Sequence, residues 1–329
     1  MNPLGPGVAA PNGGVEVLLG IDGGGPTTQA VVADLTGRII GRGLGPACNH
    51  RRVGFEAATK ALTTAIEGAL GQVVGMRSAG EGRSWRRLKV VAACFGLAGV
   101  DSTEDRELIS KWVRTEGITP RAVVVNDSEL VLIGGTAEGW GLGLISGTGS
   151  ICLGRTRDGH SARVGGWGYL FGDEGSGYSI ATEALRLASH TADGRASANG
   201  LLKGILSYWR LSNPDDLIRH VYRAEMTTSE ISELAIGVQE LAGRGDPDAI
   251  GIVDQAAKAL AVHVETVVRK LQLKQPPLAL GGSSLRASLK RGLLSHLGVE
   301  IGPVTMVQDP AQAAITIAQR ELQALGRVG

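Results

Sequence analysis

The chain has 329 residues, of which 43% are hydrophobic, and its 33 Lys and Arg nearly balance its 32 Asp and Glu. This length favours two domains over a single core, and the balanced charge argues against a nucleic-acid-binding protein, which usually carries a basic excess. The three cysteines, Cys48, Cys94 and Cys152, form no CxxC pair, which argues against a disulfide framework or a zinc site and fits a cytoplasmic protein.

In chain order, the first segment is residues 1–14, which are rich in proline and glycine. They lack the basic and apolar regions of a signal peptide and predict a disordered tail. Farther along, no apolar run is long enough to cross a membrane. From residue 15 onward strands and helices are expected to alternate, which is typical of an α/β sheet. The predicted strands are 15–21, 30–35, 38–42, 88–95 and 121–125, and the predicted helices are 53–74 and 103–116, with a polar loop at 77–87.

Residues 140–164 repeat the plan of the opening, with a strand, a loop rich in Gly and Thr, a second strand and, after a polar turn, a third. Two such copies about 125 residues apart indicate a duplicated domain. The rest of the chain is expected to be mostly helical. Its predicted elements are helices near 176–190, 229–243 and 248–272, a strand at 277–282, a helix from 285, a strand at 304–308 and a helix from 310. We therefore expect an N-terminal domain of residues 15–126 and a C-terminal domain of residues 127–329 with helical additions.

The two glycine-rich loops, 23–28 and 147–150, are candidate phosphate-binding elements, because successive backbone N–H groups can point at phosphate oxygens. Neither contains the lysine of a Walker P-loop. Both lead into a strand, whereas a dinucleotide-binding fingerprint opens a helix. A tight β-turn without a ligand explains one such loop. The duplication favours instead the paired phosphate-binding hairpins of the actin, heat-shock-ATPase and sugar-kinase superfamily.

Four stretches carry a more specific resemblance: "GIDGGGPTT", "ISGTGSICLG", "GGWGYLFGDEGSGYSIA" and "LALGGSS". Together they resemble the BadF/BadG/BcrA/BcrD ATPase family and, within it, the N-acetylglucosamine kinases. The resemblance extends from Leu18 to about Ala318. It implies an α/β fold of two actin-like (ribonuclease H-like) domains that close on ATP, Mg2+ and an amino sugar in the cleft between them.

The resemblance also implies roles for individual residues. Asp127 falls on the catalytic aspartate, and Asp22 would hold Mg2+ through water. The expected ATP-binding residues are Gly23, Gly24, Gly25, Thr27, Thr28, Gly147, Thr148, Gly149, Gly282 and Ser283. The expected sugar-binding residues are Asn49, Asp127, Ser150, Gly166, Trp167, Gly168 and Asp173.

Several of these residues also have a purely structural interpretation. Asp127 and Asp173 each precede a predicted helix, where Asp is a favoured N-cap. Asn49 could stabilise a turn after Pro46, and Trp167 could be a core residue. Two departures from the family pattern leave the exact sugar and the nucleotide affinity open: Pro26 replaces a threonine, and Ile151 stands where mammalian members have a sugar-contacting asparagine.

The predicted reaction is ATP-dependent phosphorylation of N-acetylglucosamine at the 6-hydroxyl, with Asp127 as the base, for which an ordinary pKa suffices. Glucosamine and N-acetylmuramic acid are alternative substrates. A reductase-activating ATPase of the same family would need closely spaced cysteines for an iron–sulfur cluster, and a sugar-sensing regulator would add a DNA-binding helix-turn-helix. The expected partners are the sugar and ATP, without nucleic acid or membrane, and a homodimer is one option for the oligomeric state.

Overall fold

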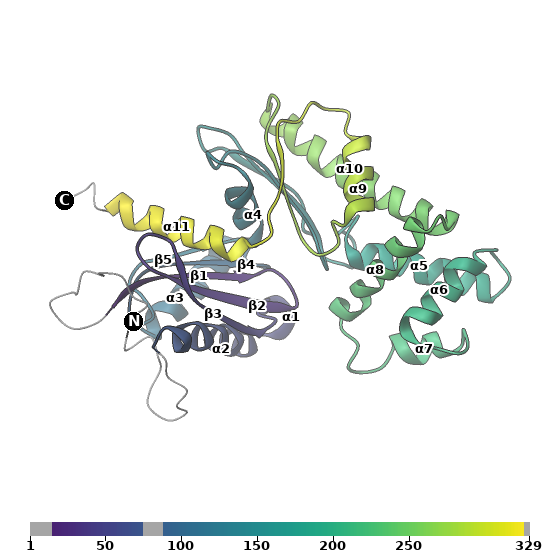
Figure 1. Ribbon diagram of the computed structural model, residues 1–329, viewed down its shortest axis with the longest axis horizontal. Coiled ribbons are helices and arrows are strands. Elements are labelled where there is room, and N and C mark those ends of the chain that lie inside the picture. The colour runs from purple at the N-terminus through teal and green to yellow at the C-terminus, as the bar shows by residue number, and fades with distance from the viewer. Residues whose placement is uncertain (1–14, 75–87, 326–329) are drawn as a thin grey trace, which may run out of the picture. The chain divides into compact units, whose positions relative to one another are not determined.

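The computed structural model describes residues 15–74 and 88–325. The predicted tail at 1–14 and the predicted polar loop at 77–87 lie outside the described residues. Contacts divide the chain into a first unit, residues 1–134 with 309–329, and a second unit, residues 135–308 (Figure 1). In the described part of the chain, no helix combines the length and the apolar character needed to span a bilayer.

The first unit is built on a five-stranded sheet with the order β3-β2-β1-β4-β5. The strands β1, β2 and β3 form an antiparallel meander, and β1, β4 and β5 are parallel. Their bounds are β1 Glu16–Gly23, β2 Thr27–Ala33, β3 Ile39–Pro46, β4 Lys89–Leu97 and β5 Ala122–Val125. The helices of this unit are α1 His50–Val53, α2 Phe55–Val74, α3 Thr103–Thr115, α4 Asp127–Gly135 and α11 Pro310–Leu325.

Both faces of the first sheet are covered, because successive side chains of a strand point to opposite faces. Leu19 of β1 belongs to a buried cluster with residues of α2 and α3. Its neighbour Leu18 lies in a second cluster with Leu130 of α4 and Ile315 of α11. This explains why β1 is apolar in consecutive positions, as expected for a strand buried on both sides.

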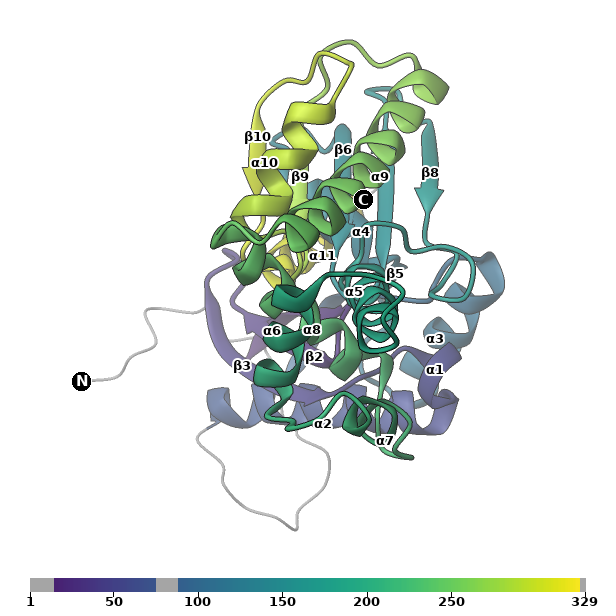
Figure 2. The same cartoon turned by 90° about the vertical axis from the view of Figure 1, so that its right-hand side faces the viewer.

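The second unit repeats this sheet, with the order β10-β9-β6-β7-β8. Again the first three strands are antiparallel and the other pairs are parallel. The strands are β6 Gly141–Ser146, β7 Ser150–Arg155, β8 Ser161–Gly165, β9 Leu278–Gly281 and β10 Val304–Met306. The helices are α5 Gly177–Ala192, α6 Asn199–Trp209, α7 Asp216–Val221, α8 Thr228–Gly243, α9 Pro247–Leu271 and α10 Ala287–His296. The long helix α9 packs across the second sheet (Figure 2).

The repeated sheet order confirms the predicted α/β fold and the duplication. The division into units differs from the predicted boundary at 126/127 in two respects. Helix α4 belongs with the first sheet, and so does α11, which returns from the end of the chain and lies along β1 and β4 (Figure 1). The reason is the cluster around Leu18, which both helices complete. The helices α6 and α7 were not predicted.

Candidate active site

The first glycine loop connects β1 to β2, and Asp22 and Gly23 are the last residues of β1. The Gly24 N–H donates to Asp22 Oδ1 at 3.2 Å. A Cβ atom on Gly24 would lie 2.6 Å from Asp127 Oδ2, whereas a Cβ on Gly25 would have no atom within 4 Å. Glycine at position 24 therefore lets the loop approach the Asp127 carboxylate, and the backbone at position 25 faces open space.

Asp127 is the first residue of α4, separated from the end of β5 by one residue, and only 8% of its surface is exposed. The predicted alternative, a helix cap, is filled by its neighbour Asn126. Asn126 Oδ1 accepts from the Ser128 N–H at 3.0 Å and from the Ser128 hydroxyl at 2.6 Å. Asp127 thus lies at the carboxyl ends of parallel strands, where open α/β sheets place ligands.

Burial raises the pKa of Asp127 to about 7, and the negative charge of Asp22 adds to this effect. The pKa of Asp127 is therefore above the ordinary value that would already suffice for a base in this reaction. Burial also raises the pKa of Asp22 to about 6; the Gly24 N–H opposes the shift and the charge of Asp309 reinforces it. Two neighbouring carboxylates that are hard to ionise together create a site that favours a cation.

Asp309 is the residue before α11, and sequence reasoning did not select it. Its Oδ2 pairs with Arg42 at 2.7 Å, and its buried Oδ1 has no hydrogen-bond partner among the described residues. An Asp before a proline often marks a helix start, but its place beside Asp22 depends on the return of α11. Within residues 15–74 and 88–325, no three His, Cys, Asp or Glu side chains form a ready metal site. Carboxylates such as Asp22 and Asp127 are oxygen donors of the kind that suits Mg2+, which usually keeps several of its water ligands.

Asn49 caps the short helix α1, with its Oδ1 accepting from the Arg51 N–H at 3.1 Å. This is close to the structural role considered for it. The cap uses the carbonyl oxygen and does not occupy the Nδ2 group. The buried hydroxyl of Thr28, a predicted ATP-binding residue, donates to the Pro46 carbonyl at 2.6 Å. Its hydroxyl therefore joins β2 to β3, while Thr27 at the start of β2 is exposed.

The second glycine loop, Gly147–Gly149, connects β6 to β7 in the second unit. The Gly147 carbonyl accepts from the Gly177 N–H at 2.8 Å and from the Ser284 hydroxyl at 3.1 Å, which fixes the loop to α5 and to the turn after β9. Thr148 Oγ1 lies 3.4 Å from Ser232 Oγ of α8. Gly282 has a φ of +99°, and a Cβ there would lie 2.3 Å from a backbone oxygen, so this turn requires glycine. Ser283 next to it is exposed.

Ser150 and Asp173 stabilise this loop through hydrogen bonds and close packing. The Ser150 hydroxyl donates to the Glu174 carbonyl at 2.7 Å, and the Ser150 N–H points to Asp173 Oδ1 at 3.4 Å. Asp173 is 4% exposed, and a Cβ on Gly149 would lie 2.8 Å from its Oδ2. The cap of α5 is Ser176 rather than Asp173. In this arrangement the Ser150 hydroxyl is engaged inside the protein.

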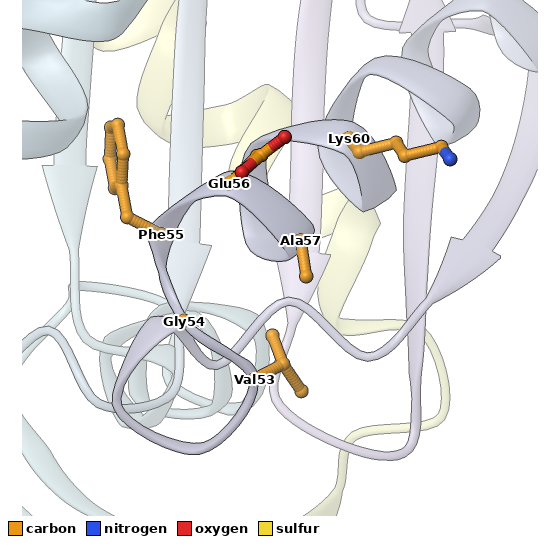
Figure 3. Close-up of a pocket in the computed structure, with 6 residues that line it drawn as sticks. All are labelled: Val53, Gly54, Phe55, Glu56, Ala57 and Lys60. Carbon is orange, nitrogen blue, oxygen red and sulfur yellow. The ribbon is translucent and has the colours of Figure 1, made fainter.

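Trp167, between Gly166 and Gly168, is 64% exposed, so it is not a core residue. Tyr169, Leu170 and Phe171 are exposed as well. The predicted residues therefore form two groups, one in each unit, and the predicted cleft that would join them stays a prediction. A separate surface hollow at the start of α2, where Phe55 and Lys60 extend away from each other (Figure 3), is lined by none of the predicted site residues.

Comparisons with known proteins agree with the fold. The chain matches the BadF/BadG/BcrA/BcrD ATPase family over residues 19–315. The N-acetylmuramic acid/N-acetylglucosamine kinase of Clostridium acetobutylicum is 33% identical over 316 residues, which cover 93% of this chain and 99% of that protein. The N-acetyl-D-glucosamine kinase of Dictyostelium discoideum is 32% identical over 318 residues, covering 92% and 98%.

Two crystal structures have a similar fold. One is that of a candidate N-acetylglucosamine kinase from Chromobacterium violaceum, with a TM-score of 0.70 and 23% identity over 92% of this chain and 99% of that one. The other is a ROK family glucokinase from Streptomyces griseus in complex with glucose and AMPPNP, with a TM-score of 0.53 and 16% identity over 93% and 99%. At these identities the likeness concerns the fold.

Proposed function

The chain belongs to the BadF/BadG/BcrA/BcrD ATPase family, and we propose that it transfers the γ-phosphate of ATP to the 6-hydroxyl of N-acetylglucosamine. The observation that carries the proposal is the position of Asp127. It is a buried carboxylate at the carboxyl end of parallel strands, next to a glycine loop and not needed as a helix cap. The amino-sugar kinases among the relatives indicate the acceptor.

In the proposed reaction, Asp127 accepts the proton of the sugar 6-hydroxyl as that oxygen bonds to the γ-phosphorus and the bond to ADP breaks. A base with a pKa near the working pH is well matched to this task. The backbone N–H groups of the two glycine loops would hold the phosphates. Phosphoryl transfer depends mostly on such positioning and on charge neutralisation.

Mg2+, when bound with ATP, would neutralise part of the phosphate charge. Asp22 would hold it through water, as the carboxylate pair with raised pKa values suggests. Asn49 in the first unit, and Asp173 and the segment Gly166–Gly168 in the second, are the proposed sugar contacts. The buried free cysteines are compatible with the cytoplasmic location that we propose.

N-acetylmuramic acid is a second candidate acceptor, because the Clostridium acetobutylicum relative acts on both sugars by its name. A coupled assay of ADP release across N-acetylglucosamine, N-acetylmuramic acid, glucosamine and glucose tests the proposal. We expect the highest kcat/KM for N-acetylglucosamine. Equal use of glucose, or a strict preference for glucosamine, would contradict the assignment.

A further inference from the structure

Residues 98–105, which comprise the turn between β4 and α3 and the first residues of α3, make polar contacts to the chain neighbours of both first-unit residues that the proposed function assigns to the sugar. We propose that this turn is a positioning frame that fixes Asn49 and Asp127 relative to each other for the acceptor. Asp105 and Asp101 are its positioning residues. The inference rests on the proposed function and adds residues that neither the motifs nor the glycine loops include.

The first set of contacts in this frame joins Asp105 to the residues that follow Asn49. Asp105 Oδ2 accepts from Arg51 Nη2 at 2.6 Å, and Asp105 Oδ1 lies 3.0 Å from His50 Nε2. Arg51 Nε also donates to the Gly99 carbonyl at 3.0 Å. Both side chains that follow Asn49 are thereby tied to the turn.

These polar contacts are important because α1 itself contributes no buried side chain to the hydrophobic core. None of its four residues is buried, so only Cys48, the residue before Asn49, connects this segment to the hydrophobic core. Asn49 itself packs against the turn, and a Cβ on Gly99 would lie 2.5 Å from Asn49 Oδ1. Beyond the buried Cys48, the position of the Asn49 side chain thus depends on Asp105 and on the backbone at Gly99.

Asp105 is itself held rigidly. Its carboxylate accepts from the Asp101 N–H at 3.2 Å and from the Ser102 N–H and hydroxyl at 3.0 Å, and Ser102 completes a capping box at the start of α3. Burial raises its pKa, but the hydrogen bonds from Arg51 and Ser102 outweigh that effect and hold the pKa well below its ordinary value. The frame therefore keeps its charge throughout the neutral range.

The second set of contacts leads to Asp127. Asp101 Oδ1 accepts from Asn126 Nδ2 at 3.1 Å. The other end of the Asn126 amide caps α4, whose first residue is Asp127. One short turn therefore holds both the start of α4 and the segment that carries Asn49.

The test compares Asp105→Asn and Arg51→Met with a matched control, Glu230→Gln. Glu230 is also a capping-box acid that pairs with an arginine, Arg223 at 3.0 Å, but it lies at the start of α8 in the second unit. Arg51→Met leaves the capping box of α3 intact, so it also serves if Asp105→Asn folds poorly.

In both test variants we expect the KM for N-acetylglucosamine to rise about tenfold, as expected when a charge-assisted tie is lost. The KM for ATP should stay within about twofold of the wild type, because the glycine loops are untouched. Glu230→Gln should leave the KM for the sugar unchanged. An unchanged sugar KM in both test variants, or an equal rise in Glu230→Gln, would overturn the frame.

Calorimetric titration with N-acetylglucosamine separates this inference from the proposed function. A wild-type protein that binds the sugar without phosphorylating it would refute the kinase assignment alone. In that case the affinity for N-acetylglucosamine tests the positioning frame, and weaker binding of the sugar by Arg51→Met would support it. Equal binding by Arg51→Met, or no binding by the wild type, would overturn it.

Discussion

Asp127 is a buried carboxylate, and the charge of the partly buried Asp22 is close enough to affect its ionisation. Burial makes an isolated carboxylate costly to ionise, and a neighbouring negative charge adds to that cost. As a base, Asp127 is therefore stronger than an exposed carboxylate. It must, however, be deprotonated before it can accept a proton from the sugar. The ionisation of Asp127 should therefore make the activity depend on pH.

The first prediction concerns that dependence. Because the pKa of Asp127 is raised to about 7, the ionised, active fraction should grow as the pH rises through about 7. We expect kcat/KM for the sugar to fall on the acid side with a midpoint near that value. In the protein without ligands, Asp22→Asn should lower the pKa of Asp127, because it removes the neighbouring charge. A flat profile between pH 5.5 and 8.5, a range of about three units around the raised value, would argue against Asp127 as the base.

The second prediction is for Asp127→Asn. Loss of a general base typically costs ~10²- to 10⁴-fold in rate, so kcat should fall by about that much. The variant should melt close to the wild type, because Asn126 and not Asp127 caps α4. The KM for ATP should hardly change. A kcat within about threefold of the wild type, on a folded variant at saturating substrates, would reject Asp127 and make Asp173 the next candidate.

Among the structural elements, the first glycine loop contains two glycines, Gly24 and Gly25, whose surroundings differ. Our third prediction is that Gly24→Ala lowers kcat by more than about tenfold, because its Cβ would lie 2.6 Å from Asp127 Oδ2. Gly25→Ala is the matched control, since a Cβ there meets nothing within 4 Å. Its kcat should stay within about threefold of the wild type. Equal losses in the two variants would mean that chain flexibility, rather than space beside Asp127, explains the glycines.

Much of the element pattern could be predicted from local sequence. The glycine loops, followed by β-branched residues, indicated hairpins, and amphipathic spacing indicated α5, α8 and α9. The contacts of Asp105 could not be predicted in this way, because its partner Arg51 lies 54 residues away in sequence. The same holds for Thr28, whose hydroxyl is used by Pro46 on the adjacent strand. Which polar atom faces a ligand and which faces a neighbouring strand is decided by tertiary packing.

At the scale of the whole molecule, the chain crosses from the first unit to the second and returns. The return could not be read from the sequence, because α11 has an apolar face that would suit either sheet. The structure assigns that face to β1, where Ala314 and Ile315 are fully buried together with Leu18. Small residues on the helix allow this approach, and a Cβ on Gly20 would lie 2.9 Å from the Ala311 carbonyl oxygen.

The fourth prediction tests this return. Ala314→Leu should destabilise the protein by about 1–3 kcal/mol, because the added methyl groups overfill the contact between α11 and β1. Arg320→Leu, at an exposed position of the same helix, should change the stability by less than about 0.5 kcal/mol. Hydrogen exchange should show lost protection in β1, β2 and β4. Loss confined to β6 and β7 would contradict the assignment of α11 to the first unit.

Identification of the phosphorylated product tests the proposed phosphorylation of N-acetylglucosamine most directly. Wild-type protein, ATP, Mg2+ and N-acetylglucosamine are incubated together, and the reaction is followed by phosphorus NMR. We expect ADP and an equal amount of a sugar phosphate whose phosphorus couples to the two protons on C6. Inorganic phosphate as the main product, or a phosphate on any other carbon of the sugar, would contradict the proposed reaction.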